Sequence, residues 1–204
     1  MNETSGRDSQ RITIRRLMRE RRRQLSDSER RSAAAAVRDR LLALSRFRHA
    51  RNIAAYLAVD GEMPLDPVIE TAWSLNIPVY LPCLRGQRME FRCYAPSTPL
   101  RENRFGIPEP ETGARISTRF LDIVLTPLTA FDTDGGRLGT GGGYYDRTFA
   151  FLLGRHAWQR PALLGIAYEF QQTAPLPLAA WDVPLHGVVT DMQTHYFRIR
   201  GRTT

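Results

Sequence analysis

The sequence contains no lysine, so its basic side chains are 29 arginines and four histidines. A P-loop needs a lysine directly after its second glycine, and this common ATP-binding motif is therefore excluded. The net charge of +8 rests on arginine, which binds phosphate groups through two parallel N–H donors. Fifteen of the arginines lie at or before Arg51, which favours a polyanionic ligand: a nucleotide, a nucleic acid or an anionic small substrate.

Cysteine and long apolar runs are scarce as well. The two cysteines, Cys83 and Cys93, are too far apart for a C-x-x-C metal or redox motif, and we expect reduced thiols. No apolar run approaches the roughly 18 residues of a transmembrane helix, and residues 1–10 lack the apolar core of a signal peptide. We therefore expect a cytoplasmic protein without membrane association.

Three familiar functional patterns are missing. There is no G-x-S-x-G nucleophile elbow, which disfavours a covalent hydrolase. The four histidines show no H-x-x-x-H pairing, which disfavours a zinc site. A G-x-G-x-x-G dinucleotide fingerprint fails, because counting from Gly139 places Tyr144 where the third glycine belongs.

The apolar pattern that is present predicts an α/β fold in one domain. Nearly continuous apolar segments, typical of strands buried on both faces of a parallel sheet, alternate with segments of helical spacing. The predicted strands cover residues 52–59, 77–81, 89–94, 121–126 and 162–168. We expect a three-layer α/β/α sandwich around a mainly parallel sheet, with an N-terminal helical pair whose second helix follows a capping box at Ser26 and Glu29. Residues 11–204 should form the domain, and residues 1–10 a mobile tail.

The most informative stretch is rich in glycine and covers residues 135–147. It follows the predicted strand 121–126 and precedes a segment, 144–153, with helical spacing. Glycine lets backbone N–H groups approach an anion closely, and the free N–H groups at a helix start favour negative charge. We therefore predict a phosphate site, to which Arg137 and Arg147 add positive charge. The alternative is an ordinary glycine-rich surface loop.

Charged residues elsewhere are candidates for the same site. Arg11 and Arg15, one helical turn apart, should project from one side of a helix and grip a single anion. Asp146 lies in the first turn of the predicted helix, where a carboxylate is favourable and can hold a divalent cation. Glu62 and Asp182 each follow an apolar stretch. Without the glycine-rich stretch, a solvent-facing role would be the better interpretation for each carboxylate.

Several motifs together resemble the 5-formyltetrahydrofolate cyclo-ligase family. The specific one is the stretch from Arg137 to Arg147, with the segment from Asp122 to Asp132 before it. Four other stretches agree with the family in order and spacing, although each is unspecific alone. They are Arg11-x-x-x-Arg15, Tyr56-Leu57 followed by Gly61-Glu62, Phe105 to Pro110, and Trp181-Asp182-Val183 before Val188 to Thr190. The resemblance covers nearly the whole chain from Arg11.

The resemblance implies an ATP- and Mg²⁺-dependent ligase that converts 5-formyltetrahydrofolate to 5,10-methenyltetrahydrofolate, with release of ADP and phosphate, through a phosphorylated formyl intermediate. The implied ATP contacts come from an arginine pair and the loop: Arg11, Arg15, Arg137, Leu138, Gly139, Thr140, Gly141, Gly142, Gly143, Tyr144 and Tyr145. The implied folate contacts are Leu57, Glu62, Thr140, Gly141, Gly142, Gly143 and Tyr144. Asp146 and Asp182 would hold the metal, and Arg137, Tyr144 and Tyr145 would act in catalysis.

The chain departs from the family pattern at two positions. Arg11 stands where many members have lysine, which keeps the charge but changes the geometry. Thr140 stands where an aromatic residue, methionine or arginine is commoner. Two other functions stay open: a relative that kept the ATP site but changed substrate, and a nucleic-acid-binding module built on the arginines up to Arg51. No DNA- or RNA-reading motif supports the module, and we expect a monomer whose partners are small molecules.

Overall fold

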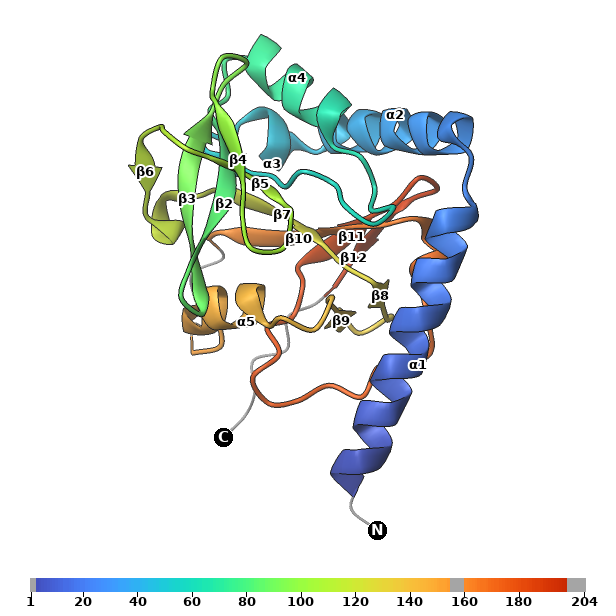
Figure 1. Ribbon diagram of the computed structural model, residues 1–204. Coiled ribbons are helices and arrows are strands. Elements are labelled where there is room, and N and C mark those ends of the chain that lie inside the picture. Colours follow the sequence, from blue (N-terminus) through green and yellow to red (C-terminus); the bar gives the residue numbers. More distant parts are fainter. Residues whose placement is uncertain (1–2, 155–159, 198–204) are drawn as a thin grey trace.

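The computed structural model of the chain describes residues 3–154 and 160–197. An eight-stranded sheet in the order β12-β11-β10-β7-β1-β2-β3-β6 forms its centre (Figure 1). In the same order, from β12 at one edge to β6 at the other, the strands are Thr194–Tyr196, Gly187–Val189, Ala162–Ile166, Ile123–Pro127, Ile53–Ala54, Val79–Arg85, Arg88–Tyr94 and Arg115–Ile116. The five strands from β11 to β2 are parallel, and the outer strands pair antiparallel. The predicted α/β fold with a mainly parallel sheet is confirmed.

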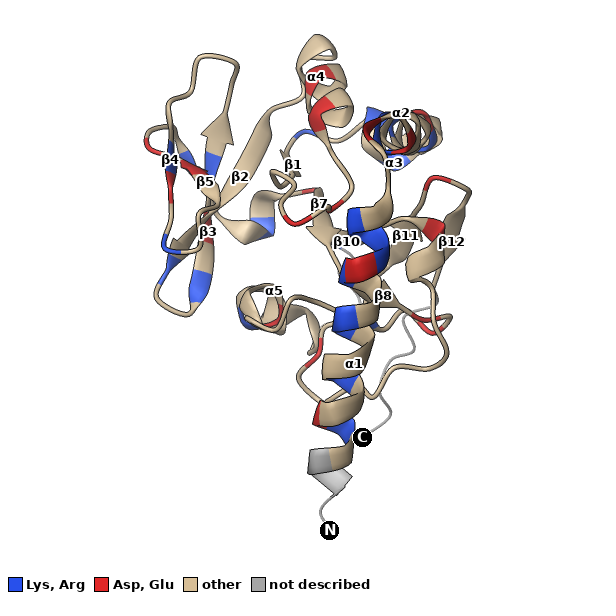
Figure 2. Ribbon diagram, turned by 45° about the vertical axis from the view of Figure 1, so that its right-hand side comes forward, with Lys and Arg blue, Asp and Glu red and all other residues tan. Residues whose placement is uncertain are grey.

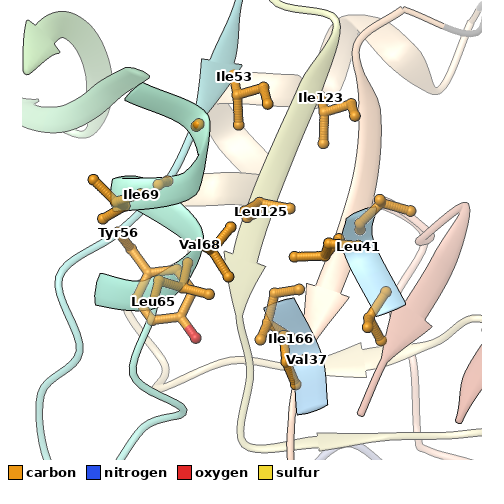
Figure 3. Close-up of a cluster of buried hydrophobic side chains, with 14 of the residues drawn as sticks. Val37, Leu41, Ile53, Tyr56, Leu65, Val68, Ile69, Ile123, Leu125 and Ile166 are labelled. Carbon is orange, nitrogen blue, oxygen red and sulfur yellow. The ribbon is translucent and has the colours of Figure 1, made fainter. Parts of the chain in front are cut away.

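Alternate residues of the central strands face two separate hydrophobic clusters, because successive side chains of a strand point to opposite faces of the sheet. On one face, Ile53 and Ile123 pack with α2 (Asp27–Ala43), α3 (Ser45–Arg48) and α4 (Asp66–Ser74), as Figure 3 shows for α2 and α4. On the other face, Ala54 and Val124 pack with α5 (Tyr144–Phe149) and the following 3-10 turn, Ala150–Leu152. The layers are therefore α/β/α, with the second helical layer much smaller.

The N-terminal helical pair is present, and its first member is longer than predicted. Helix α1 runs from Glu3 to Gln24 and so includes most of residues 1–10, for which the sequence predicts a tail. The turn to α2 is closed by the predicted capping box, in which Ser26 and Glu29 each accept a hydrogen bond from the other's backbone N–H. None of the described helices is long and apolar enough to span a bilayer.

The strand predicted over residues 52–59 is shorter in the structure. Strand β1 ends at Ala54, and the chain then leaves the sheet as a loop that turns at Asp60 and Gly61, both with positive φ. This left-handed turn lies after residue 59, so residues 55–59 have already left the sheet as a loop before the chain reaches it. In this loop Ala55 and Tyr56 are buried, whereas Leu57 and Val59 are half-buried and Ala58 is exposed, and the loop carries Glu62 toward α1.

Small elements complete the fold. Two short hairpins lie outside the main sheet: β4 with β5 (Leu100–Glu102 and Pro108–Pro110), and β8 with β9 (Ala130–Phe131 and Arg137–Leu138). Two further 3-10 turns cover Thr118–Phe120 and Glu169–Gln171. The β8–β9 hairpin follows β7 directly and faces α1, so it connects the sheet to the N-terminal helix (Figure 1).

Candidate functional site

The glycine-rich stretch is divided by a strand, whereas the sequence predicts one continuous loop. Gly135 and Gly136 belong to the turn of the β8–β9 hairpin, where the buried Asp132 carboxylate accepts hydrogen bonds from the backbone N–H groups of Asp134 and Gly136. Strand β9 places Arg137 in the interior, and only the segment after it forms an open loop. The first glycines therefore shape a hairpin, and the later ones border the site.

Helix α5 begins where the sequence predicts but is shorter. It spans Tyr144–Phe149 and continues only as a 3-10 turn, whereas the helical spacing extends to residue 153. Gly143 precedes it with φ +63°, a conformation that glycine adopts without strain. Few aligned peptides contribute to a dipole in so short a helix, so the positive potential here comes mainly from arginine side chains.

A cavity of about 300 Å³ lies where α1, the glycine-rich loop and α5 meet. Its walls include ten of the residues predicted for the site, from three separate parts of the chain. These are Arg11, Arg15, Arg137, Leu138, Gly139, Gly141, Gly143, Asp146, Arg147 and Asp182. The remaining walls are Ala150 and Trp181. The lining thus carries four arginines and two carboxylates, a cationic surplus that suits an anion.

Two ion pairs hold the carboxylates of the cavity in place. Arg137 donates from Nη2 to Asp146 Oδ1 at 2.6 Å, and the same oxygen accepts the backbone N–H of Val183 at 3.1 Å. Arg11 donates from Nη2 to Asp182 Oδ2 at 2.5 Å across 171 positions of sequence. Each carboxylate is therefore oriented before any ligand binds.

Arg15 occupies the middle of the cationic wall. It donates from Nε to the carbonyl of Gly139 at 2.9 Å, which ties α1 to the glycine-rich loop. Burial, followed by the neighbouring positive charges of Arg11 and Arg19, lowers the pKa of the Arg15 guanidinium. An anion in the cavity would relieve this crowding of cations.

The donor set fits a magnesium ion shared with phosphate groups better than a metal held by protein alone. Asp146 and Asp182 line the same cavity. Among the described residues no cluster of three or more histidine, cysteine or acidic side chains could hold a metal. Magnesium typically uses one or two carboxylates and completes its shell with water and substrate phosphates. The two aspartates supply such a partial shell.

Four predicted residues of the loop and α5 do not line this cavity. Thr140 and Gly142 are exposed, and the carbonyl of Thr140 accepts a weak hydrogen bond from Arg19 at 3.4 Å. The hydroxyl of Tyr144 meets the Arg104 guanidinium, and its ring lies edge-on to Phe105 with centroids 6.2 Å apart. Tyr144 therefore connects the tip of the β4–β5 hairpin to the glycine-rich loop.

Tyr145 faces the interior on the other side of α5. Its ring stacks on Phe149 and lies 5.8 Å from the Arg137 guanidinium. Burial and then the charge of Glu62 raise the pKa of its hydroxyl. Tyr145 therefore lies between the cavity and the surroundings of Glu62.

Glu62 and Leu57 form a second group of predicted residues outside the cavity. Glu62 is only 6% exposed, and its Oε2 accepts the backbone N–H of Val59 at 3.2 Å. Burial raises the pKa of Glu62 to about 7, against the opposing effects of that hydrogen bond and of Arg22. Leu57 is half-buried against the core beneath α2 and α4. The structure thus brings most predicted residues into one cavity and places these two on an adjoining loop.

Sequence reasoning did not assign some residues that the structure places here. Trp181 lines the cavity although 68% of the residue is exposed. Its position next to Asp182 in the sequence could have identified it as a residue of the site. Arg22 is buried beside Glu62, and Arg104 contacts Tyr144. No sequence signal separates these two arginines from the many others, because only the packing selects them.

The fold and the site define an α/β protein with an arginine-lined cavity that suits a phosphate-bearing ligand and a divalent cation. The chain belongs to the 5-formyltetrahydrofolate cyclo-ligase family, a family of enzymes, whose model matches residues 7–191. The 5-formyltetrahydrofolate cyclo-ligase of Haemophilus influenzae is 40% identical over 77% of this chain and 84% of its own length. The protein of the same name from Escherichia coli K12 is 35% identical over 85% of this chain and 96% of its own.

A solved structure agrees with this assignment. The NMR structure of 5,10-methenyltetrahydrofolate synthetase from Aquifex aeolicus matches with a TM-score of 0.80 and 31% identity, covering 95% of each chain. A synthetase from Mycoplasma pneumoniae, 23% identical over 89% of this chain and 98% of its own, shares the fold with a TM-score of 0.70. The family resemblance predicted from the motifs is confirmed.

Proposed function

We propose that this protein is a 5-formyltetrahydrofolate cyclo-ligase that uses ATP and Mg²⁺ to form 5,10-methenyltetrahydrofolate, with release of ADP and phosphate. The observation that carries the proposal is the cavity with four arginines and two aspartates, in a chain that belongs to this family. Neither part is sufficient alone, since a cationic cavity suits many anions and family members can change substrate.

The ATP phosphates would bind between α1 and the glycine-rich loop. Arg11 and Arg15 approach from the helix and Arg137 from β9, and the glycine-rich loop adds its backbone. Gly139 has no heavy atom within 4 Å of the position where a Cβ would be, so the loop leaves room for a ligand to approach its backbone. Asp146 and Asp182 would hold the magnesium ion, which neutralises developing phosphate charge.

The proposed chemistry has two steps. The formyl oxygen attacks the γ-phosphorus of ATP and ADP leaves. N10 of the folate then attacks the activated formyl carbon, loses its proton, and phosphate leaves. Phosphoryl transfer of this kind depends on positioning and charge neutralisation, which the arginines provide. The phosphorylated formyl group must be kept from water between the steps, and we assign that role to the rings of Tyr144 and Tyr145.

The folate ring would be bound on the loop that follows β1. Leu57 offers an apolar contact and Glu62 a carboxylate that can accept ring N–H groups. Tyr145 supports this placement because Glu62 raises its pKa and Arg137, which lines the cavity, is near its ring. The two substrates would therefore meet at α5.

The orientation of the α1 arginines disfavours nucleic acid as the main partner. Basic residues recur along α1 (Figure 2), yet several of them bond back to the protein. Arg11 donates to Pro177 and Asp182, Arg15 to Gly139, and Arg23 to Asp60. Side chains used in this way are not available for a row of backbone phosphates.

The test is to incubate purified protein with 5-formyltetrahydrofolate and MgATP and to follow the absorbance of methenyltetrahydrofolate. We expect product only when both ATP and Mg²⁺ are present. No product, or product formed equally well without ATP, would contradict the proposal. A panel of other formylated folates and amines, tested in the same assay, would identify a changed substrate. We further propose a monomeric cytoplasmic enzyme, and light scattering tests the monomer.

A further inference from the structure

Arg22, near the end of α1, is a buried arginine whose bonding is incomplete. Only 1% of the residue is exposed, and neither Nε nor Nη2 has a hydrogen-bond partner. Its Nη1 donates to the carbonyl of Leu128 at 3.4 Å, a long hydrogen bond. A buried guanidinium with unsatisfied N–H groups is destabilising relative to an apolar side chain of similar size. Its presence therefore needs an explanation.

A role in holding the loop at Asp60 does not explain why Arg22 is buried. The closest approach between the two is 3.7 Å, from Arg22 Nη2 to Asp60 Oδ2. Asp60 already accepts two hydrogen bonds from Arg23, at 2.7 and 2.9 Å, and lies 3.4 Å from Arg19 Nε. The loop that carries Asp60 is thus held by more exposed arginines.

Glu62 is the other acidic group beside Arg22, because it directly follows Gly61, where a Cβ would lie 3.3 Å from Arg22 Cβ. Burial raises the pKa of this carboxyl group, and the positive charge of Arg22 opposes that effect and favours the ionised form. The other charged and titratable groups around Glu62 are Arg19 on α1 and Asp60 on its own loop, together with Tyr56 and Tyr145, whose hydroxyls it affects. Neither Nε nor Nη2 of Arg22 donates a hydrogen bond to Glu62, because both atoms have no hydrogen-bond partner.

We propose that Arg22 is a positioning residue that favours the carboxylate form of Glu62 without bonding to its oxygens, so that Glu62 can accept two N–H groups from the substrate ring. The proposal rests on the proposed function, because it concerns the folate that Glu62 would bind. A pterin ring presents an amide N–H and an amino group side by side, and a carboxylate accepts such a pair, whereas a protonated carboxyl has one oxygen that donates instead. A direct Arg22–Glu62 salt bridge would occupy the oxygens that the substrate needs. Charge acting from a distance avoids that competition.

The experiment compares Arg22→Met and Arg22→Lys with Arg23→Met, which removes a neighbouring exposed arginine from the same helix. Equilibrium binding of 5-formyltetrahydrofolate without ATP is measured from pH 6 to pH 9. For Arg22→Met we expect affinity at pH 6.5 to fall about tenfold and to approach the wild-type value at pH 9, because burial without the guanidinium further favours the neutral carboxyl. Arg22→Lys should restore part of the affinity. Arg23→Met should follow the wild-type curve, and all variants should bind inorganic triphosphate equally.

A loss of folate affinity that is the same at every pH, or an equal loss of triphosphate binding, would show a merely structural role and overturn the proposal. The double variant Arg22→Met with Glu62→Gln should bind folate no more weakly than Glu62→Gln alone, since Arg22 acts through Glu62. Additive losses would contradict this.

A measurement without substrate separates this proposal from the proposed function. Carbon-13 NMR of the glutamate carboxyl groups, with Glu62 assigned from the signal missing in Glu62→Gln, follows the titration of Glu62 directly. The midpoint should be higher in Arg22→Met than in the wild type, and Arg22→Lys, which keeps the buried charge, should lie between them. An unchanged midpoint in both variants overturns the role of Arg22 even if the enzyme is a cyclo-ligase. A raised midpoint supports it even if folate does not bind.

Discussion

Among single residues, Arg137 combines a structural and a chemical position. Its guanidinium is buried, bonds to Asp146 and to the carbonyl of Val183, and still lines the cavity. Arg15 lines the same cavity but is only half-buried and makes one hydrogen bond, to Gly139. Replacing each arginine in turn should therefore distinguish an effect on ligand binding from an effect on the stability of the fold.

We expect Arg137→Met to lower both activity and stability, and Arg15→Met to lower activity alone. The free energy of unfolding, from urea denaturation, should fall by about 1–3 kcal/mol for Arg137→Met, because Asp146 and Val183 lose a buried donor. For Arg15→Met the change should be below about 1 kcal/mol. Both variants should lose at least about tenfold in kcat/KM for ATP. Equal stability losses in the two variants would contradict this assignment.

Asp182 tests the proposed magnesium site. It is bonded by Arg11 and by the backbone N–H of Ala179, so Asp182→Asn keeps the size of the side chain while removing its charge. We expect the Mg²⁺ concentration for half-maximal activity, at saturating ATP, to rise at least about tenfold. The exposed Asp134 provides the matched control, and Asp134→Asn should leave the Mg²⁺ concentration for half-maximal activity unchanged. An unchanged magnesium requirement in Asp182→Asn would remove this residue from the metal site.

Among the elements, the loop after β9 and strand β10 use glycine for opposite reasons. A Cβ at Gly165 in β10 would lie 2.6 Å from Leu128 Cδ2 and 2.7 Å from Leu185 Cδ1, both in the fully packed core. A Cβ at Gly139 would meet no heavy atom within 4 Å. One glycine allows close packing, and the other leaves the edge of the cavity open.

We therefore expect Gly165→Ala to destabilise the protein by about 1–3 kcal/mol through overpacking. Gly139→Ala should change the free energy of unfolding by less than about 0.5 kcal/mol but raise KM for ATP, since its methyl group occupies the open space at the loop. Thermal or urea unfolding and ATP kinetics on both variants measure this. A stable Gly165→Ala together with an unstable Gly139→Ala would reverse the assignment.

The elements also show what the sequence can predict. The α2 start was predictable because a capping box is local chemistry between Ser26 and Glu29. The end of β1 was not, because the apolar residues up to Val59 fit a buried strand equally well, whereas the structure ends the strand at Ala54 and continues as a loop. The β8–β9 hairpin was hidden for a similar reason, since two-residue strands have no measurable periodicity.

For the site, motifs predicted residues but not their arrangement. Ten of the twelve residues that line the cavity were predicted, although Arg11 and Asp182 are at opposite ends of the sequence. Arg22 could not be predicted, because one buried arginine cannot be distinguished by sequence from the exposed arginines around it. The binding and catalytic roles of all these residues stay predictions, both for those that line the cavity and for Thr140, Gly142, Tyr144, Tyr145, Leu57 and Glu62.

In the whole molecule, α1 spans both parts of the site. Its first half supplies Arg11 and Arg15 to the cavity, and its second half places Arg22 beside Glu62. The buried Glu62 affects the stability of the entire fold, because its pKa is about 7 when folded and near its ordinary value of 4.5 when unfolded. Between these values the folded state binds more protons, so the contribution of Glu62 to stability falls as pH rises.

Glu62→Gln is therefore expected to be more stable than the wild type at neutral and higher pH. The difference in free energy of unfolding should be small below pH 4.5, grow through pH 7, and reach up to about 3 kcal/mol, since a tenfold change in an acid constant is worth about 1.4 kcal/mol. Urea denaturation of both proteins at several pH values measures it. The same variant should bind folate more weakly. A wild type that is more stable than Glu62→Gln at pH 8 would contradict the account.

The most direct test of the central claim is the stoichiometry of the reaction. Methenyltetrahydrofolate and ADP are quantified in the same samples after the protein is mixed with 5-formyltetrahydrofolate and MgATP. We expect one ADP for each methenyltetrahydrofolate, and neither product when Mg²⁺ is chelated. Methenyltetrahydrofolate without ADP, or ADP formed at the same rate when folate is omitted, would contradict it.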